Sequence, residues 1–169
     1  MQFIDIQGPV GANTVYVDGK LVAKDTTFSL PEVTPKTTSV NAMGDMDVMI
    51  IGQLEPMEAS IKKIGIDLGL GKLCKMENHD YELRWTQQVT KSDGTSSTVG
   101  CKAFLRGFPK TIMPGISIEN GSPTEGEIPI AVTRYQLYAN GEEVCCIDRL
   151  AQIIRIDGKD YFNDLSSLL

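Results

Sequence analysis

The sequence predicts a mainly β fold: a barrel or sandwich of antiparallel hairpins with one short helix. Three turns flanked by β-rich runs carry this prediction: Asp18-Gly19, residues 91–95 and Asn140-Gly141. Asp-Gly and Asn-Gly accept the positive φ angles of tight hairpin turns, so they are strong hairpin signals. Long segments also alternate apolar with polar residues, as strands with one buried face do. The 169 residues fit a single domain, residues 1–169.

The first half of the chain contains one clear hairpin and two less regular segments. Residues 26–41 are rich in Thr, Ser and Pro, so a strand there must be irregular, broken or at an edge. Residues 47–64 carry many apolar side chains but are interrupted by a glycine and a proline. Long strands or a projecting hairpin fit this pattern better than a helix. We therefore expect a loop or hairpin over residues 40–60.

The second half contains the expected helix and two further hairpins. Residues 66–76 place apolar side chains at helical intervals, although two glycines each cost about 1 kcal/mol of helix propensity. Residues 81–86 and 99–106 alternate as amphipathic strands, with the sole tryptophan, Trp85, on the apolar face. Residues 128–147 form the last hairpin. We expect Trp85 to lie in the core.

Composition excludes several classes of protein. No run approaches the ~18 apolar residues of a membrane span, and the first residues lack the basic and apolar regions of a signal peptide. We therefore expect the chain to be made in a bacterial cytoplasm and not to insert into a membrane. The cysteines lack any metal-ligand spacing, and we expect buried thiols in a reducing compartment. They are Cys74, Cys101, Cys145 and Cys146.

The net charge of −6 is concentrated in one stretch. Residues 111–148 hold six acids against one base, a difference of −5. Such a stretch repels phosphate groups and argues against nucleic-acid binding. Five of these acids are candidates for a functional surface: Glu119, Glu125, Glu127, Glu142 and Glu143.

The sequence contains no recognisable catalytic constellation. The single histidine, His79, has no nucleophile or metal-binding motif in its pattern, so a turn or capping role is expected. Gly69-Leu70-Gly71 lacks the third glycine and the preceding strand of a dinucleotide-binding loop. We therefore predict no catalytic site, no cofactor and no metal, and a protein that is not an enzyme.

Methionines gather in the segment around the expected projecting loop. Methionine is adaptable and common at contact surfaces, but it also fills gaps in cores. Both interpretations stand at this point. The four methionines concerned are Met43, Met46, Met49 and Met57.

In order and spacing, several short motifs resemble those of the major tail tube proteins of contractile-tailed phages and R-type bacteriocins. The resemblance covers nearly the whole chain. Its most specific parts are residues 30–36, which are similar to the family's Leu-Pro-x-Leu-Thr-x-Lys stretch, Gly44-Asp45-Met46, the Arg-Gly-x-x-Lys-like Arg106-Gly107-Phe108-Pro109-Lys110, and the closing Asp157-Gly158-Lys159-Asp160. Residues 1–12 have no counterpart in that family and form an N-terminal arm.

The resemblance implies a structural function. Subunits of this kind form sixfold rings that stack into a tube inside a contractile sheath, in a virion tail or bacteriocin particle. The implied partners are other copies of the chain, the sheath protein, and tape-measure and baseplate proteins, with DNA only as non-specific passing cargo. The four methionines then become candidates for contacts between rings, and the five acids for the lumen or the sheath-facing surface.

One alternative has the same strands and turns. A soluble β-sandwich binding module, such as a baseplate-like or carbohydrate-binding protein, would be monomeric or a small oligomer. Long strands with open edges favour the ring former, because an exposed edge recruits another chain and a closed ring leaves no edge free.

Overall fold

The computed structural model describes residues 4–169, and within them the fold is almost entirely antiparallel β. The elements, in order, are β1 (Ile6–Val17), β2 (Lys20–Lys24), β3 (Thr27–Ser29), β4 (Pro35–Asn41), β5 (Asp45–Leu54), β6 (Met57–Ile64), α1 (Leu68–Leu73), β7 (His79–Thr90), β8 (Ser96–Pro109), β9 (Glu125–Ala139), β10 (Glu142–Asp148), β11 (Ile153–Ile156), β12 (Lys159–Asp160) and α2 (Asn163–Ser166). This is the mainly β class that the turn and alternation patterns predict.

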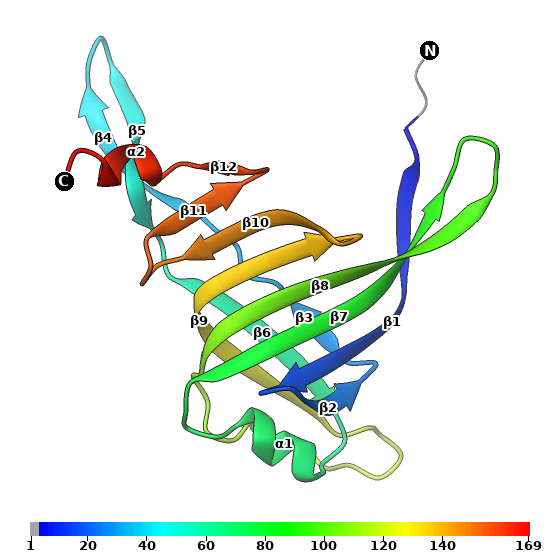
Figure 1. Ribbon diagram of the computed structural model, residues 1–169. Coiled ribbons are helices and arrows are strands. Elements are labelled where there is room, and N and C mark those ends of the chain that lie inside the picture. Colours follow the sequence, from blue (N-terminus) through cyan, green and yellow to red (C-terminus); the bar gives the residue numbers. More distant parts are fainter. Residues whose placement is uncertain (1–3) are drawn as a thin grey trace.

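Ten strands form one curled sheet in the order β12-β11-β10-β9-β8-β7-β1-β2, with β6 paired to β9 and β3 paired to β6 (Figure 1). The β3–β6 branch folds across the β1–β7–β8 part, and both contribute side chains to one hydrophobic core. Among the described residues, β2 and β3 follow each other in the chain but do not pair. The sheet therefore stays open, and the fold is sandwich-like rather than a closed barrel.

The long strand β9 belongs to both layers because its neighbour on one side changes along its length. Residues 125–132 pair with β6, and residues 134–139 pair with β10. On its other side β9 pairs with β8 over residues 130–139, with a bulge in β8 between Arg106 and Gly107. A Cβ atom on Gly107 would overlap the carbonyl oxygen of Ala131, so the two backbones approach more closely here than any side chain permits.

Helix α1 closes one end of the core. Asp67 caps it by accepting a hydrogen bond from the Leu70 amide at 3.2 Å. Leu73 is fully buried and Leu70 nearly so. The helix is shorter than the predicted residues 66–76, because the cap at Asp67 fixes its start and Cys74 ends it after six residues.

The three predicted turns are present. Asp18 and Gly19, and likewise Asn140 and Gly141, have φ angles between 51° and 81°, which is the conformation of a tight hairpin turn. Trp85 is half-buried and packs edge-on against Phe28, with ring centroids 5.7 Å apart. The second short helix, α2, has no counterpart in the sequence prediction, since four residues are too few to show a period.

Strands β4 and β5 form a separate two-stranded hairpin that projects from the body (Figure 1). Its strands span residues 35–54, whereas the sequence indicated residues 40–60. The two ranges differ at both ends: the hairpin begins five residues earlier, at Pro35, and residues 57–60 belong to β6, in the core of the body. Pro35 stands first in β4, where a missing amide hydrogen disrupts no inner ladder.

Candidate assembly surfaces

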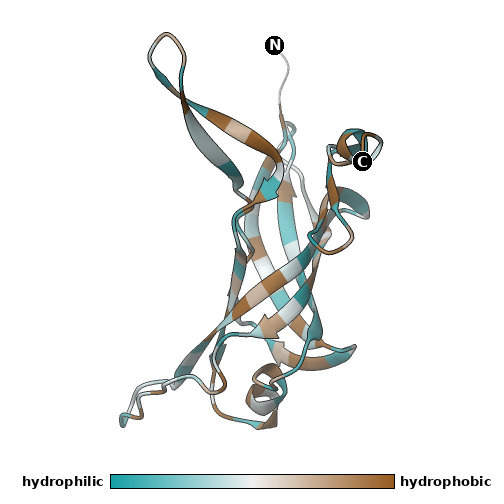
Figure 2. Ribbon diagram, turned by 90° about the vertical axis from the view of Figure 1, so that its left-hand side faces the viewer, coloured by the Kyte–Doolittle hydropathy of each residue, from teal (hydrophilic) through white to brown (hydrophobic). Residues whose placement is uncertain are grey.

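The β4–β5 hairpin presents an exposed apolar surface, here called the hairpin surface. Residues 36–49 are exposed throughout. Met43, at the tip, is fully exposed, while Met46 and Met49 are 50% and 57% exposed. Figure 2 shows hydrophobic residues along this projecting ribbon, away from the body. The members of the hairpin surface are Val40, Met43, Met46, Val48, Met49 and Ile51.

Met57 does not belong with the other three methionines. It is the first residue of β6, 2% exposed, and part of the hydrophobic core. Its side chain is therefore unavailable for contact with another ring, and its inclusion among the contact candidates was wrong. The sequence contained a signal for this, because Met57, Ala59 and Ile61 alternate with polar residues as a half-buried strand does.

Open strand edges lie on both sides of the large sheet. Among the described strands, β12 ends the sheet on one side. On the other side β2 pairs with β1 only from Thr14 onward, so residues 6–13 of β1 have β7 on one side and no strand on the other. Ile6 and Val10 in this stretch are more than half exposed. Residues 1–3 of the expected arm lie outside the described residues.

The five acidic candidates lie in two places rather than one. Glu119, Glu125 and Glu127 are near the start of β9, whereas Glu142 and Glu143 follow its far end. Two of them are already paired with bases: Glu125 lies 2.8 Å from the Lys62 amine, and Glu143 accepts two hydrogen bonds from Arg155. Whether these acids face a lumen or a sheath stays a prediction.

Sequence reasoning missed a polar face that crosses the large sheet, although alternation on β7, β8 and β9 was its signal. Strand register aligns four charged residues, one from each of β7, β8, β9 and β10, in a single row. The row reads Asp80, Arg106, Arg134, Asp148. Arg106 pairs with Asp80 at 2.8 Å and Arg134 with Asp148 at 4.0 Å, so this row carries no net charge.

His79 is buried, with 2% of its surface exposed, and it is the first residue of β7. Its Nδ1 lies 2.8 Å from an Asp18 carboxylate oxygen, and its Nε2 lies 3.1 Å from the Lys75 carbonyl oxygen. The hydrogen bond from His79 lowers the pKa of Asp18 below its ordinary value, helped by a second bond from the Asp80 amide. His79 thereby joins the β1–β2 turn to the segment that leaves α1.

The cysteines show no sign of reactivity. All four thiols are free, three are buried and Cys145 is half-buried. Burial raises the pKa of the Cys74 and Cys145 thiols, which disfavours the nucleophilic thiolate. Within residues 4–169 no group of three or more His, Cys, Asp or Glu side chains could hold a metal ion, and no helix is long and apolar enough to cross a membrane.

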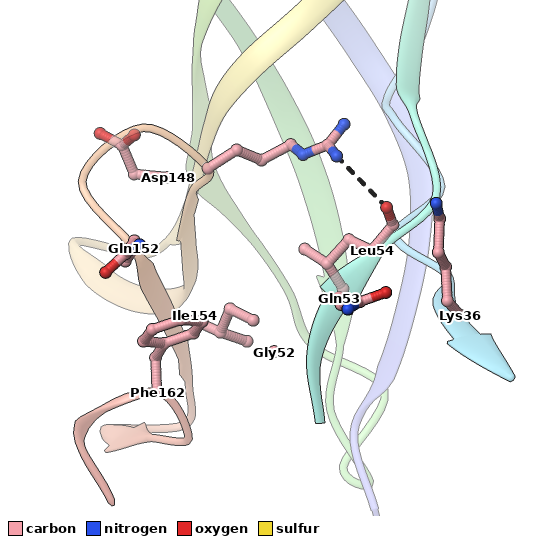
Figure 3. Close-up of a pocket in the computed structure, with 9 residues that line it drawn as sticks. Lys36, Gly52, Gln53, Leu54, Asp148, Gln152, Ile154 and Phe162 are labelled. Carbon is pink, nitrogen blue, oxygen red and sulfur yellow. Dashed lines mark hydrogen bonds between the residues drawn. The ribbon is translucent and has the colours of Figure 1, made fainter. Parts of the chain in front are cut away.

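A cleft separates the base of the hairpin from the last strands and helix (Figure 3). Arg149 crosses it, donating a hydrogen bond to the Leu54 carbonyl oxygen at 3.3 Å. Phe162 and Ile154 point toward Gly52 from the other wall. A more apolar cavity of about 480 Å³ continues from there between β5 and the chain's last residues.

The fold has a counterpart among solved structures. A chain in the cryo-EM structure of the sheath-tube complex of an extracellular contractile injection system, PVC, in its extended state, aligns with a TM-score of 0.52 and 17% identity. The alignment covers 78% of this chain and 90% of that one. At this identity the likeness concerns the fold, which is that of a chain from a contractile sheath-tube assembly. No curated protein matches the sequence.

The family follows from the sequence itself. The family model for phage tail tube protein FII matches residues 10–169, and the chain belongs to that family. It is a structural subunit of a tail tube. Membership decides between the two classes left open by the sequence, in favour of the tube subunit and against the independent binding module.

Proposed function

We propose that this chain forms hexameric rings that stack into the inner tube of a contractile phage tail or phage-tail-like bacteriocin, with a structural and not a catalytic role. The observation that carries the proposal is the hairpin surface. A two-stranded hairpin is at best marginally stable alone in water, and this one exposes six large apolar side chains. Such a surface is favoured only where a second molecule covers it, and stacking of identical rings supplies that molecule.

Ring formation uses the open sheet edges. One edge is formed by β12 and the other by β2 with residues 6–13 of β1, and they lie at opposite ends of the strand order. An interface between two different edges of the same subunit is heterologous, so repeated rotation generates a closed ring. Closure leaves no unpaired edge to recruit foreign chains.

The partners outside and inside the ring follow from the proposed tube. The sheath protein would surround the outer wall, tape-measure protein or DNA would occupy the channel, and a baseplate would start assembly. The acidic candidates suit either wall: on the channel side they repel passing phosphates, and on the outside they attract a basic segment of the sheath. Assembly of the particle in the host bacterial cytoplasm is part of the same proposal.

Electron microscopy of the purified protein tests the proposal directly. We expect rings or tubes to appear as the protein concentration rises, with sedimentation showing a multiple of the 18.5 kDa subunit. If the protein stays monomeric at high micromolar concentration and low salt, the measurement is repeated with a baseplate seed. A monomer in the presence of a seed would contradict the tube and favour the soluble binding module.

A further inference from the structure

Few backbone interactions hold the β4–β5 hairpin in position on the body. Within the described part of the chain it shares no strand pairing with the ten-stranded sheet, and residues 36–49 are exposed. At its base the Glu55 amide donates to the Thr34 carbonyl oxygen at 2.8 Å, and Arg149 donates to the Leu54 carbonyl oxygen. The first hydrogen bond closes the base of the hairpin, between the residue before β4 and the residue after β5, and the second joins this base to the rest of the subunit. The angle of the hairpin on the body is left to be set by packing.

Packing comes from the half-buried part of β5 and from the last residues of the described chain. Ile50, Gly52 and Leu54 are the half-buried members of β5, and all three line the cavity that this strand shares with the last residues of the chain. That part of β5 lies against residues 159–169, here called the C-terminal segment, which comprises β12, α2 and the residues after it. Figure 1 shows α2 at the root of the hairpin.

Gly52 is the point of closest approach. Its φ of +85° suits glycine, and a Cβ atom there would lie 2.8 Å from Leu165 Cδ1 and 2.9 Å from Phe162 Cε2. The missing side chain therefore makes the space that the two apolar side chains occupy, of which Figure 3 shows Phe162. Both are half-buried, while most of their neighbours in the segment are exposed.

The C-terminal segment is itself attached to the body. Asp160 pairs with Arg155 of β11, and the Tyr161 amide donates to the Ile154 carbonyl oxygen at 2.8 Å. A continuous path of contacts thus runs from the large sheet through β11 and the segment to Gly52. The cavity of about 480 Å³ beside this path leaves the hairpin dependent on few contacts.

We propose that the C-terminal segment fixes the orientation of the β4–β5 hairpin on the subunit. Phe162 and Leu165 are the positioning residues, and they pack against the backbone at Gly52. The consequence for assembly rests on the proposed function: a hairpin held at one angle meets the next ring in register, and a loosened hairpin does not. The segment thereby controls stacking although it need not touch the neighbouring ring.

Hydrogen–deuterium exchange of the unassembled subunit tests the proposal. In Leu165→Ala, peptides from residues 35–54 should exchange about tenfold faster, while peptides from β7, β8 and β9 keep their protection. The matched control is Leu169→Ala, which makes the same change at a fully exposed position and should leave exchange of the hairpin unaltered. Unchanged hairpin exchange in a Phe162→Ala, Leu165→Ala double variant would overturn the proposal, and so would equal loss of protection throughout the body.

The same contact can be disturbed from the hairpin side. Gly52→Ala should accelerate hairpin exchange as Leu165→Ala does, because its methyl group displaces both side chains. Gly44→Ala shares the backbone strain, with a φ of +113°, but meets no atom within 4 Å and should leave the base of the hairpin protected. Equal exchange at the hairpin base in the two glycine variants would count against the contact.

Microscopy then separates this proposal from the proposed function. Leu165→Ala should still form rings but give fewer or shorter tubes than Leu169→Ala. If hairpin exchange accelerates and tubes form normally, the segment positions the hairpin as proposed, and the role of the hairpin in stacking is what fails.

Discussion

At the scale of single residues, Gly107 explains part of a family-like motif. In the Arg-Gly-x-x-Lys-like stretch, Arg106 pairs with Asp80, and Lys110 pairs with Glu58 at 2.8 Å. Gly107 stands between them, at the bulge where β8 pairs with Val132 of β9. The sequence shows such a motif but cannot show why its glycine is needed, because the obstructing atom belongs to Ala131, which is 24 positions away in the chain.

Gly107→Ala should therefore destabilise the subunit severely. The obstacle is a backbone carbonyl oxygen that cannot rotate away, so we expect a loss of at least about 1–3 kcal/mol of unfolding free energy, as for overpacked cores. Gly100→Ala is the control on the same strand, since a Cβ atom there meets nothing within 4 Å. Urea unfolding of both variants measures the difference, and equal midpoints would contradict the close approach at β9.

A second residue, Asp18, makes the stability of the folded subunit depend on pH. Because the hydrogen bond from His79 lowers the pKa of Asp18, the folded state gains stability from the ionised carboxylate. That gain is complete above the unfolded pKa of about 4 and is lost as the pH falls through the lower folded value. Asp18→Asn keeps a residue that accepts the turn's positive φ but removes the charge.

We expect Asp18→Asn to unfold at a lower urea concentration than the wild type at pH 7, with the gap narrowing below about pH 4. Unfolding curves at both pH values measure this. A gap that is the same at pH 7 and pH 3 would show that the carboxylate charge contributes nothing through His79.

At the scale of elements, the methionines of the projecting hairpin lie on the surface, whereas the methionine that begins β6 lies in the core. Met46→Asp with Met49→Asp should block stacking and leave the subunit folded, because both side chains are at least half exposed. Met57→Asp would instead bury an unpaired carboxylate and unfold the subunit. Circular dichroism and microscopy check the two outcomes; an unfolded Met46, Met49 double variant would place those side chains in a core.

How far each element could be predicted depends on the range of the interactions that form it. Tight turns such as Asp18-Gly19 are local, so the sequence indicates them directly. The change of neighbour along β9 is not local, because β6 precedes β9 in the chain by about 60 residues and β10 follows it. The alternation within each strand does not show which strands will pair. The C-terminal segment was missed for the same reason, since its contact with Gly52 joins parts of the chain more than a hundred residues apart.

At the scale of the whole molecule, the acidic side chains lie near the two ends of β9, and their roles in an assembled tube can be tested by charge reversal. Lys replacing Glu119, Glu125, Glu127, Glu142 or Glu143 reverses one charge in every copy of an assembled tube, so the effect on the potential is summed around each ring. Reversal at a channel position should slow delivery of DNA without harming tube assembly. Reversal at a sheath-facing position should leave bare tubes intact and uncouple the sheath.

Replacement by Gln at the same positions is the matched control, because it removes the charge without reversing it. Salt dependence is a second readout, as exposed charges are screened over about 8 Å at physiological ionic strength. If Lys at all five positions alters neither DNA delivery nor sheath attachment, the acids are ordinary solvated surface. The sequence located the excess of acids, but it could not show that Lys62 and Arg155 already neutralise two of them.

The separateness of the β4–β5 hairpin bears on how a tail built from this subunit would respond to bending. A ten-stranded sheet resists shear, because slipping the strands breaks many ladder hydrogen bonds together. The strands of the hairpin pair with each other, and the hairpin is held at its root by the Arg149–Leu54 hydrogen bond and by the packing at Gly52. A tilt at this root therefore disturbs far fewer contacts than a slip within the sheet. In a stack joined through such hairpins, flexure would concentrate in the joints between rings, so the bore of each ring would keep its shape while the tail curved.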